Sequence, residues 1–392
     1  LFLTRKIILF TPIFKTVTVL GLHGKPMDLR LFNSESSAFA GSSLFWYVLR
    51  RKLGLTGPGI RIYDPESREY GDSFIFNIRP GIFSLWFVQK SSGTAHVDRN
   101  QVDREYYMRR NSVSDIALIL KTVIAYFFHS EDYGSSSKIK LFGVDFLNLT
   151  MNEAVKRIID TVESGEKRRF FFVNPDCFNQ TFDDQEYLDI LKNTPDIFPD
   201  GIGVKIACKM LKTPMLENVN GTDMLPFLCE AASKKRKSIF LLGGRPGIAE
   251  RTKNNLLVRY AKLKIAGTWQ GYFDHEFQSE MVINAINNSG ADILLVAFGV
   301  PLQEKWIYEH FDEINCKAQL GVGGLFDFYS NNVKRAPKWM REIGLEWLFR
   351  LMMEPRRMFK RYVIGNPVFL WRVMRWRKER NKKTQPESDE QK

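Results

Sequence analysis

Polar residues that follow short apolar runs are the first places where this sequence could do chemistry. Asn174-Pro175-Asp176 follows the run at 169–173, and Asp200 stands in Phe198-Pro199-Asp200-Gly201. A carboxylate at a strand end can accept a proton from a sugar hydroxyl when partial desolvation raises its basicity. The same aspartate could instead cap the helix expected to start near Gly201. The residues alone leave both interpretations open.

Two further loops have residue types suited to an anionic or polar ligand. Gly243-Gly244 ends the strand expected at 238–242, and a glycine turn lets the backbone approach a phosphate. Such a turn is equally typical of any tight connection between a strand and a helix. Residues 298–306 bring an amide, a carboxylate, an ammonium group and an indole after another predicted strand. These groups could orient a ligand, or they could cap a helix and fill the core.

These loops need a scaffold that brings strand ends together, and the sequence predicts one. Strand-like apolar runs at 169–173, 238–242, 292–298 and 319–323 alternate with helical segments, which include 183–193, one ending near 211 and one beginning near 248. Such alternation indicates an α/β fold, a Rossmann-like parallel sheet with helices on both faces. Sheets of this kind bind ligands at the carboxyl ends of their strands.

Charge and texture divide the 392-residue chain into regions. A polar linker at 131–137 separates residues 1–130, which end in a predicted helix at 114–128, from the α/β pattern at 138–333. A helical appendage at 334–383, with breaks expected at Pro337, Pro355 and Pro367, precedes a polar tail at 384–392. The net charge is +13, and the appendage alone, with 16 basic and four acidic residues, accounts for +12 of it.

Composition excludes several classes of protein and site. With 44% hydrophobic and 26% charged residues, the chain is globular rather than disordered. Its four cysteines lack CxxC spacing and its five histidines are scattered, so buried thiols are expected and a metal site is not. No apolar run reaches the roughly 20 residues that span a bilayer. The apolar start of the chain is interrupted by Arg5-Lys6, Pro12 and Lys15.

A series of motifs in a fixed order carries a family resemblance. The motifs are NPD at 174–176, PDGIGV at 199–204, GTD at 221–223, FLLGG at 240–244, GYF at 271–273, FGVPLQEKW at 298–306, GVGGLFDF at 321–328 and RAPKWMREIGLEWLFRLMMEPRRMFKRYVIGN at 335–366. Residues 139–380 resemble the WecG/TagA/CpsF family of inverting glycosyltransferases. The resemblance implies transfer of an N-acetylmannosamine-type sugar from a UDP-sugar donor to a polyprenyl-diphosphate-linked acceptor, with no metal or other cofactor, in surface-polysaccharide or cell-wall polymer synthesis.

The resemblance also implies roles for individual residues. Asp200 would be the general base for the acceptor hydroxyl, and Gln303 the amide that orients the substrate. The other positions expected to bind the substrates are Asn174, Asp223, Gly243, Gly244, Tyr272, Gly299, Pro301 and Asp327. In the absence of a metal motif, the appendage is expected to neutralise the UDP diphosphate. The candidates for that role are Arg350, Arg357 and Arg361.

Two positions depart from the family pattern. Phe172 stands where the family usually has threonine, and Asn218 stands where it usually has arginine. Both changes remove a polar group that is expected near the reaction centre. The alternative hypothesis is therefore a weakened or inactive relative that acts as a membrane-bound binding or scaffold protein in polysaccharide assembly.

The first 130 residues resemble the later part of a bacterial sugar transferase that attaches a sugar 1-phosphate to polyprenyl phosphate. The matching segments are GLHGKPMDLRLF at 21–32, VLRRKLGLTGPG at 48–59, RPGIFSLWFVQ at 79–89 and DREYYMRRNSVSDIALILKTV at 103–123. That family attacks with an Asp-Glu pair, whereas residues 33–47 contain Glu35 and no acidic pair. We expect a degenerate α+β region whose remaining role is docking to a membrane or a partner.

An apolar stripe with basic neighbours marks the end of the appendage. The stripe consists of Phe369, Leu370, Val373 and Met374, at helical spacing. This pattern is typical of a helix at an anionic membrane surface, and predicts a peripheral or monotopic protein at the cytoplasmic face of the membrane. One alternative is a helix packed on its own domain. Another is a nucleic-acid binder, because Trp371 and Trp376 interleave with arginines, but we expect no nucleic-acid partner. A homo-oligomer is compatible with the sequence and not specified by it.

Overall fold

The structure is a computed structural model that describes residues 14–32, 44, 47–61, 77–94, 98–128 and 136–384. The chain divides into two compact units, Leu1–His129 and Ser130–Lys392. Most of the predicted linker, residues 131–135, and of the predicted polar tail, residues 385–392, lies outside the described residues.

Within the described residues, the first unit combines short strands with three α-helices. A hairpin of β1 (Phe14–Leu20) and β2 (Pro26–Phe32) is antiparallel, and β3 (Gly54–Thr56) pairs in parallel with β4 (Gly81–Phe83). The helices are α3 (Leu85–Ser92), α4 (Arg99–Arg109) and α5 (Ser112–Phe128). The helix predicted at 114–128 is therefore confirmed. The segment 33–47, which contains Glu35 and no acidic pair, lies largely outside the described residues.

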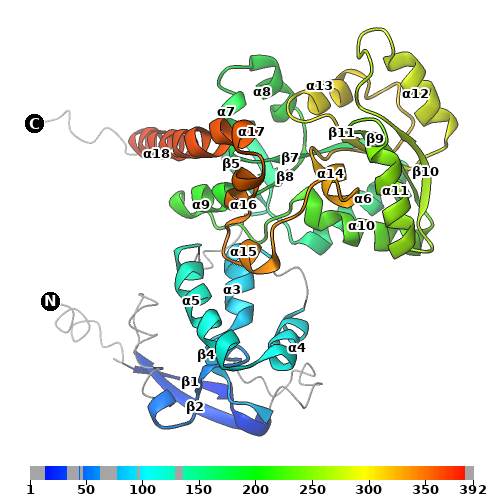
Figure 1. Ribbon diagram of the computed structural model, residues 1–392. Helices are drawn as coiled ribbons and strands as arrows, with labels where there is room; N and C mark the ends of the chain where they lie inside the picture. Colours follow the sequence, from blue (N-terminus) through cyan, green and yellow to red (C-terminus); the bar gives the residue numbers. More distant parts are fainter. Residues whose placement is uncertain are drawn as a thin grey trace, which may run out of the picture. The chain divides into compact units, whose positions relative to one another are not determined.

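The second unit is built on a six-stranded sheet in which all neighbouring strands run parallel. The strands are β7 (Arg168–Val173), β8 (Asp196–Pro199), β9 (Ser238–Gly243), β10 (Lys264–Trp269), β11 (Ile293–Ala297) and β12 (Ala318–Gly321). Their order across the sheet is β10-β9-β11-β12-β7-β8 (Figure 1). A separate antiparallel hairpin of β5 (Lys138–Leu141) and β6 (Val144–Leu147) precedes this sheet.

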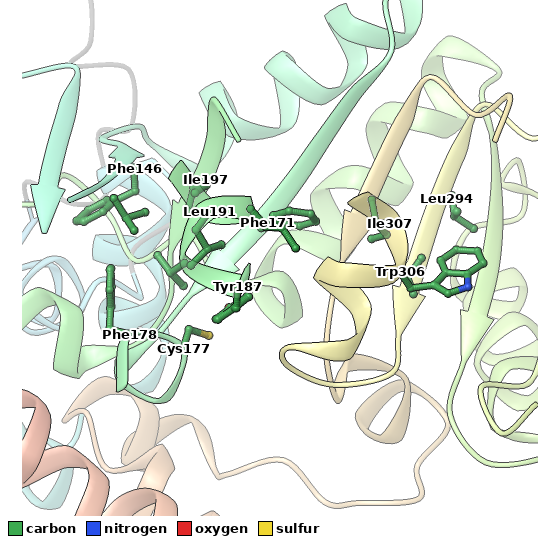
Figure 2. Packing of buried hydrophobic residues seen from close by; sticks show 14 of the residues in the cluster. Phe146, Phe171, Cys177, Phe178, Tyr187, Leu191, Ile197, Leu294, Trp306 and Ile307 are labelled. Atoms are coloured by element: carbon green, nitrogen blue, oxygen red, sulfur yellow. The ribbon is translucent and has the colours of Figure 1, made fainter. Parts of the chain in front are cut away.

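Helices connect these strands and cover both faces of the sheet, as the predicted Rossmann-like α/β fold requires. They are α6 (Met151–Ser164), α7 (Pro175–Gln180), α8 (Gln185–Lys192), α9 (Ile202–Met210), α10 (Gly221–Lys235), α11 (Ile248–Arg259), α12 (Ser279–Asn288), α13 (Leu302–Glu309) and α14 (Leu325–Tyr329). The side chains of β7 alternate between the two faces of the sheet, so this strand contributes to the buried clusters on both faces. Phe171 and Val173 belong to one buried cluster, whereas Phe170 and Phe172 belong to the other. Figure 2 shows Phe171 in the first cluster, which also contains Trp306 of α13.

The basic appendage is helical, as predicted, and it packs on the second unit. Its segments are α15 (Lys338–Glu342), α16 (Glu346–Met353), α17 (Pro355–Met358), the π-helical η3 (Phe359–Ile364) and α18 (Gly365–Thr384). Pro337 and Pro355 mark helix starts, as expected. The break expected at Pro367 is wrong, because this proline lies in the first turn of α18, where a backbone N–H has no helical partner.

The apolar stripe of α18 faces the protein core. Phe369 and Val373 are fully buried, and the Phe369 ring stacks on Phe178 of α7 with centroids 5.9 Å apart. Figure 1 shows α18 beside α7, and Met374 remains exposed. The interpretation that this stripe faces lipid is therefore wrong for Phe369 and Val373. An amphipathic pattern fits a core as well as a bilayer, and here the ring of Phe178 offers the apolar contact.

Candidate functional site

A cavity of about 750 Å³ opens where four neighbouring strands of the sheet end. Its floor comes from the residues that follow β7, β8, β11 and β12, and the appendage supplies the opposite wall. The predicted site residues that line it are Asn174, Asp200, Gly299, Gln303, Arg350, Arg357 and Arg361. A carboxylate, two amides and three guanidinium groups from segments far apart in the sequence thus meet in one cavity.

Asp200 is held at the end of β8 by its own backbone and by its neighbour. Its N–H donates to the carbonyl oxygen of Val173, 2.8 Å away, which joins it to the adjacent strand β7. The N–H of Gly201 donates to Oδ1 of Asn218 at 2.6 Å. Gly201 has φ +93°, a backbone conformation that glycine adopts without strain. Helix α9 has no side-chain cap, so the capping alternative for Asp200 is excluded.

The surroundings of Asp200 make its carboxyl group a stronger base than an exposed aspartate. Burial raises its pKa from 3.8 to about 6, and the charge of Glu346 acts in the same direction. The positive charges of Arg361 and Arg350 and a hydrogen bond with Asn174 favour the carboxylate and limit the shift. The carboxylate therefore predominates at neutral pH and yet remains basic enough to accept a proton.

Asn174 positions the turn that follows β7. Its Oδ1 accepts hydrogen bonds from the N–H groups of Asp176, at 3.0 Å, and Cys177, at 3.2 Å, and so caps α7. Asp176 Oδ2 lies 3.4 Å from Nε of Arg361. The NPD motif therefore places one side chain beside Asp200 and another beside an arginine of the appendage.

Gln303 joins two strand-end loops rather than projecting freely. Its Oε1 accepts hydrogen bonds from the N–H groups of Gly323, at 2.8 Å, and Gly299, at 3.3 Å. Its Nε2 donates to Oε1 of Glu304 at 2.8 Å. Glu304 is fully buried, and burial raises its pKa to about 7. Gln303 therefore fixes the cavity floor, and it is 2% exposed.

The three arginines come from three consecutive segments of the appendage. Arg350 of α16 lies over the ring of Phe328, 5.3 Å from its centroid, and its Nε is buried without a hydrogen-bond partner among the described residues. Arg357 of α17 is exposed and lies 3.3 Å from Glu354. Together with Arg361 these groups form a cationic wall opposite the strand ends, suited to a diphosphate.

Sheet order explains why several predicted residues lie elsewhere. In the described part of the chain, Gly243, Gly244 and Tyr272 do not line this cavity. Gly243 ends β9, Gly244 follows it and Tyr272 follows β10, and these two strands occupy the opposite end of the sheet from β7 and β8. The backbone of Gly243 packs against that of Ala297, where a Cβ would come within 2.5 Å of the carbonyl oxygen. The packing of β9 against β11 therefore explains why this position is glycine.

Three further predicted residues also lie outside the described lining of the cavity. Pro301 starts α13 between lining residues, and Asp327 accepts a hydrogen bond from Asn332 at 3.0 Å. Asp223 pairs with Arg335 at 2.7 Å and with Arg341 at 3.5 Å. Asp223 therefore attaches the start of the appendage to α10.

The two departures from the family pattern have different surroundings. Phe172 lines the cavity, and its ring packs on that of Phe198 with centroids 5.6 Å apart. It places an apolar ring at the end of β7, where the family's usual threonine would place a hydroxyl group. Asn218, by contrast, accepts the hydrogen bond from Gly201 and so holds the loop of Asp200. Asn218 thus retains a polar function beside the candidate base.

Comparison with known proteins places the chain in a family. The pattern of the glycosyl transferase WecG/TagA/CpsF family matches residues 139–383. The chain belongs to this family. It is 34% identical over 220 residues to an N-acetylglucosaminyldiphosphoundecaprenol N-acetyl-beta-D-mannosaminyltransferase of Bacillus subtilis, a match that covers 55% of this chain and 83% of the relative. A protein of the same name from Staphylococcus aureus strain MRSA252 is 29% identical over 245 residues, which cover 62% of this chain and 94% of the relative.

The WecG/TagA/CpsF match begins at residue 139, so it does not test the resemblance of the first 130 residues to a sugar transferase. That resemblance stays a prediction. The expected buried thiols are confirmed, since all four cysteines are buried and free.

Sequence reasoning missed several residues of the cavity in this family member. Asp176 is part of the NPD motif and Arg372 is one of the basic neighbours of the apolar stripe, but neither is among the predicted site residues. Both line the cavity, as do Asn179, Asp183 and Lys360. The packing of α18 on α7 is what brings such residues to the cavity. It is a tertiary contact, so no local sequence pattern could have identified them.

Proposed function

We propose that the chain transfers an N-acetylmannosaminyl residue from a UDP-linked donor to an acceptor sugar carried on a polyprenyl diphosphate. The names of its relatives support this substrate pair. The observation that carries the proposal is the meeting of Asp200 with Arg350, Arg357 and Arg361 in one cavity.

The proposed reaction is a single displacement at the anomeric carbon. The Asp200 carboxylate takes the proton of the acceptor hydroxyl while that oxygen forms a bond to the anomeric carbon. The bond from this carbon to the β-phosphate oxygen breaks, and UDP leaves with the electron pair. Attack opposite to the leaving group inverts the configuration. The raised pKa of Asp200, about 6, suits a base that acts near neutral pH.

Charge on the departing diphosphate is the second requirement of this reaction. We propose that the guanidinium groups of the cationic wall neutralise it and favour its departure. Arginine suits this role, because its planar donors match phosphate oxygens and its charge persists at any relevant pH. In this proposal no metal ion takes part, so a chelator is expected to leave turnover unchanged.

The test uses purified chain, UDP-N-acetylmannosamine and a short-chain polyprenyl-diphosphate N-acetylglucosamine in detergent. We expect UDP release that requires both substrates, inversion at the anomeric carbon, and a loss of about 10²- to 10⁴-fold for Asp200→Asn. Full activity of that variant would refute the assignment of the base. UDP binding without turnover would instead support the alternative of a binding or scaffold protein, to which the apolar Phe172 gives some weight.

We also propose that the protein works as a peripheral protein at the cytoplasmic face of an anionic membrane, where a lipid-linked acceptor would be found. Within the described residues, no helix is long and apolar enough to cross a bilayer. The outer surface of the appendage exposes Phe359, Val363 and Trp371 beside Arg356 and Arg375. Apolar side chains among cations suit an anionic lipid surface. Cosedimentation with anionic but not zwitterionic vesicles would support this location, and equal binding to duplex DNA would contradict it.

A further inference from the structure

The cavity extends beyond the part that the donor chemistry uses. One half lies between the strand-end loops and the arginines of α16 and α17. The other half is bounded by α7 and the turn after it on one side, and by η3 and α18 on the other. Asp200 and Arg361 line the same cavity as these residues.

The wall formed by α7 and α18 is fixed in place by polar contacts. Nη1 of Arg372 donates to the carbonyl oxygen of Asn179 at 3.1 Å and to its Oδ1 at 2.9 Å. Nδ2 of Asn179 donates to the carbonyl oxygen of Gly365 at 2.8 Å. The guanidinium of Arg372 also lies 3.9 Å from the centroid of the Phe182 ring. A wall held this firmly presents its remaining groups in a defined arrangement.

The remaining lining groups of this half are of three chemical types. Asp183 and Lys360 line the cavity, are exposed to solvent, and have no side-chain hydrogen bond or ion pair within the described residues. Ile364 and Val368, which also line this half, bring apolar surface to it, and Ile364 is 51% exposed. Carboxylate, ammonium and aliphatic groups thus line the same half of the cavity.

We infer that this half of the cavity binds the acceptor, a sugar on a polyprenyl diphosphate. In this arrangement Asp183 accepts hydrogen bonds from sugar hydroxyls, Lys360 pairs with the diphosphate, and Ile364 and Val368 contact the first isoprene units. The inference rests on the proposed function and adds to it the place of the second substrate. It also gives a role to the exposed apolar surface of Ile364, since only the acceptor has a lipid part.

The first experiment separates acceptor from donor binding in the full chain. Asp183→Asn and Lys360→Gln are compared with Asp312→Asn and Lys262→Gln, which change the same charges on exposed residues outside the cavity. We expect the KM for the short-chain acceptor to rise about tenfold or more in the first pair, because each loses a charged partner. The dissociation constant of UDP, measured by calorimetry, stays within about twofold of the parent value. An unchanged acceptor KM in both variants, or an equal loss of UDP affinity, would overturn the inference.

The second experiment tests the apolar surface of Ile364. Ile364→Ser should raise the KM for a polyprenyl-linked acceptor but not for the same sugar diphosphate on a methyl group. Equal effects on both acceptors would exclude contact with the lipid.

Direct binding distinguishes failure of this inference from failure of the proposed function. If the parent chain shows no turnover, binding of the short-chain sugar diphosphate lipid is measured by calorimetry in detergent. Binding that Lys360→Gln weakens would support the subsite while the activity fails. Normal turnover with unaffected variants would leave the function standing and refute the subsite.

Discussion

Replacing Asp200 by asparagine should lower activity and raise stability at the same time. The side chains have nearly equal size, so the substitution removes the base without opening a cavity. Loss of a general base lowers kcat/KM by about 10²- to 10⁴-fold. In the parent protein, kcat/KM should fall about tenfold per pH unit below the pKa of about 6, because only the carboxylate accepts a proton.

The gain in stability follows from the shifted pKa of Asp200. Folding raises that pKa from 3.8 to about 6, so the fold disfavours the carboxylate relative to the unfolded chain. A shift of about two units corresponds to about 3 kcal/mol as an upper limit. Because the carboxylate lies at a cavity that water enters, we expect about 1–2 kcal/mol. This cost is absent below about pH 4, grows between pH 4 and 6, and is complete above pH 6.

Urea unfolding at pH 4 and pH 7.5 measures this difference for the parent, Asp200→Asn and the surface control Asp312→Asn. The variant should be more stable than the parent at pH 7.5 and equal to it at pH 4, whereas the control should change little at either pH. A variant that loses both activity and stability at pH 7.5 would refute the electrostatic reasoning. It would indicate that the carboxylate stabilises the fold.

Three further outcomes are expected. Asn218→Ala should lower kcat about tenfold, because the N–H of Gly201 loses its acceptor. Asn218→Asp keeps an acceptor oxygen and should keep most of the activity. Steady-state kinetics would show the difference, and an unaffected alanine variant would contradict it. Arg350→Ala should weaken UDP binding in calorimetry about tenfold, and unchanged affinity would remove this residue from the proposed diphosphate site. Phe369→Ala should lower the free energy of unfolding by about 3–5 kcal/mol, against less than about 0.5 kcal/mol for the exposed Met374→Ala, and similar urea midpoints for both would contradict the packing of α18.

Much of the fold could be predicted because strong local signals coincide with it. The apolar runs that precede NPD and Gly243-Gly244 became β7 and β9, close to their predicted bounds. By contrast β10 was not predicted, because its residues are only partly buried and its sequence, KIAGTW, is mixed. Local pattern identifies strands that are buried on both faces more readily than an edge strand of this kind.

The candidate site was only partly predictable, because strand order is not written in local sequence. Rules for parallel sheets place every strand end at one edge, and this led to Asp200, to Gly243 and to the loop at 298–306. The family resemblance added Gln303 and Tyr272. Among the described residues, only the ends of β11, β12, β7 and β8 adjoin the appendage. The residues at the ends of β9 and β10 therefore remain outside the described cavity lining. Knowing the order of strands requires the long-range pairing that the fold itself provides.

The two roles expected of the appendage, closing over a diphosphate and contacting a membrane, are compatible because different faces of it would serve them. Phe369 and Val373 anchor α18 in the core, and this orients Arg372 toward α7 and the cavity. The opposite face then exposes Trp371 and Arg375. Buried apolar anchors are insensitive to ionic strength, whereas attraction between exposed cations and lipid is screened within about 10 Å at 0.1 M salt. Salt should therefore release the protein from a membrane without detaching the wall that completes the cavity.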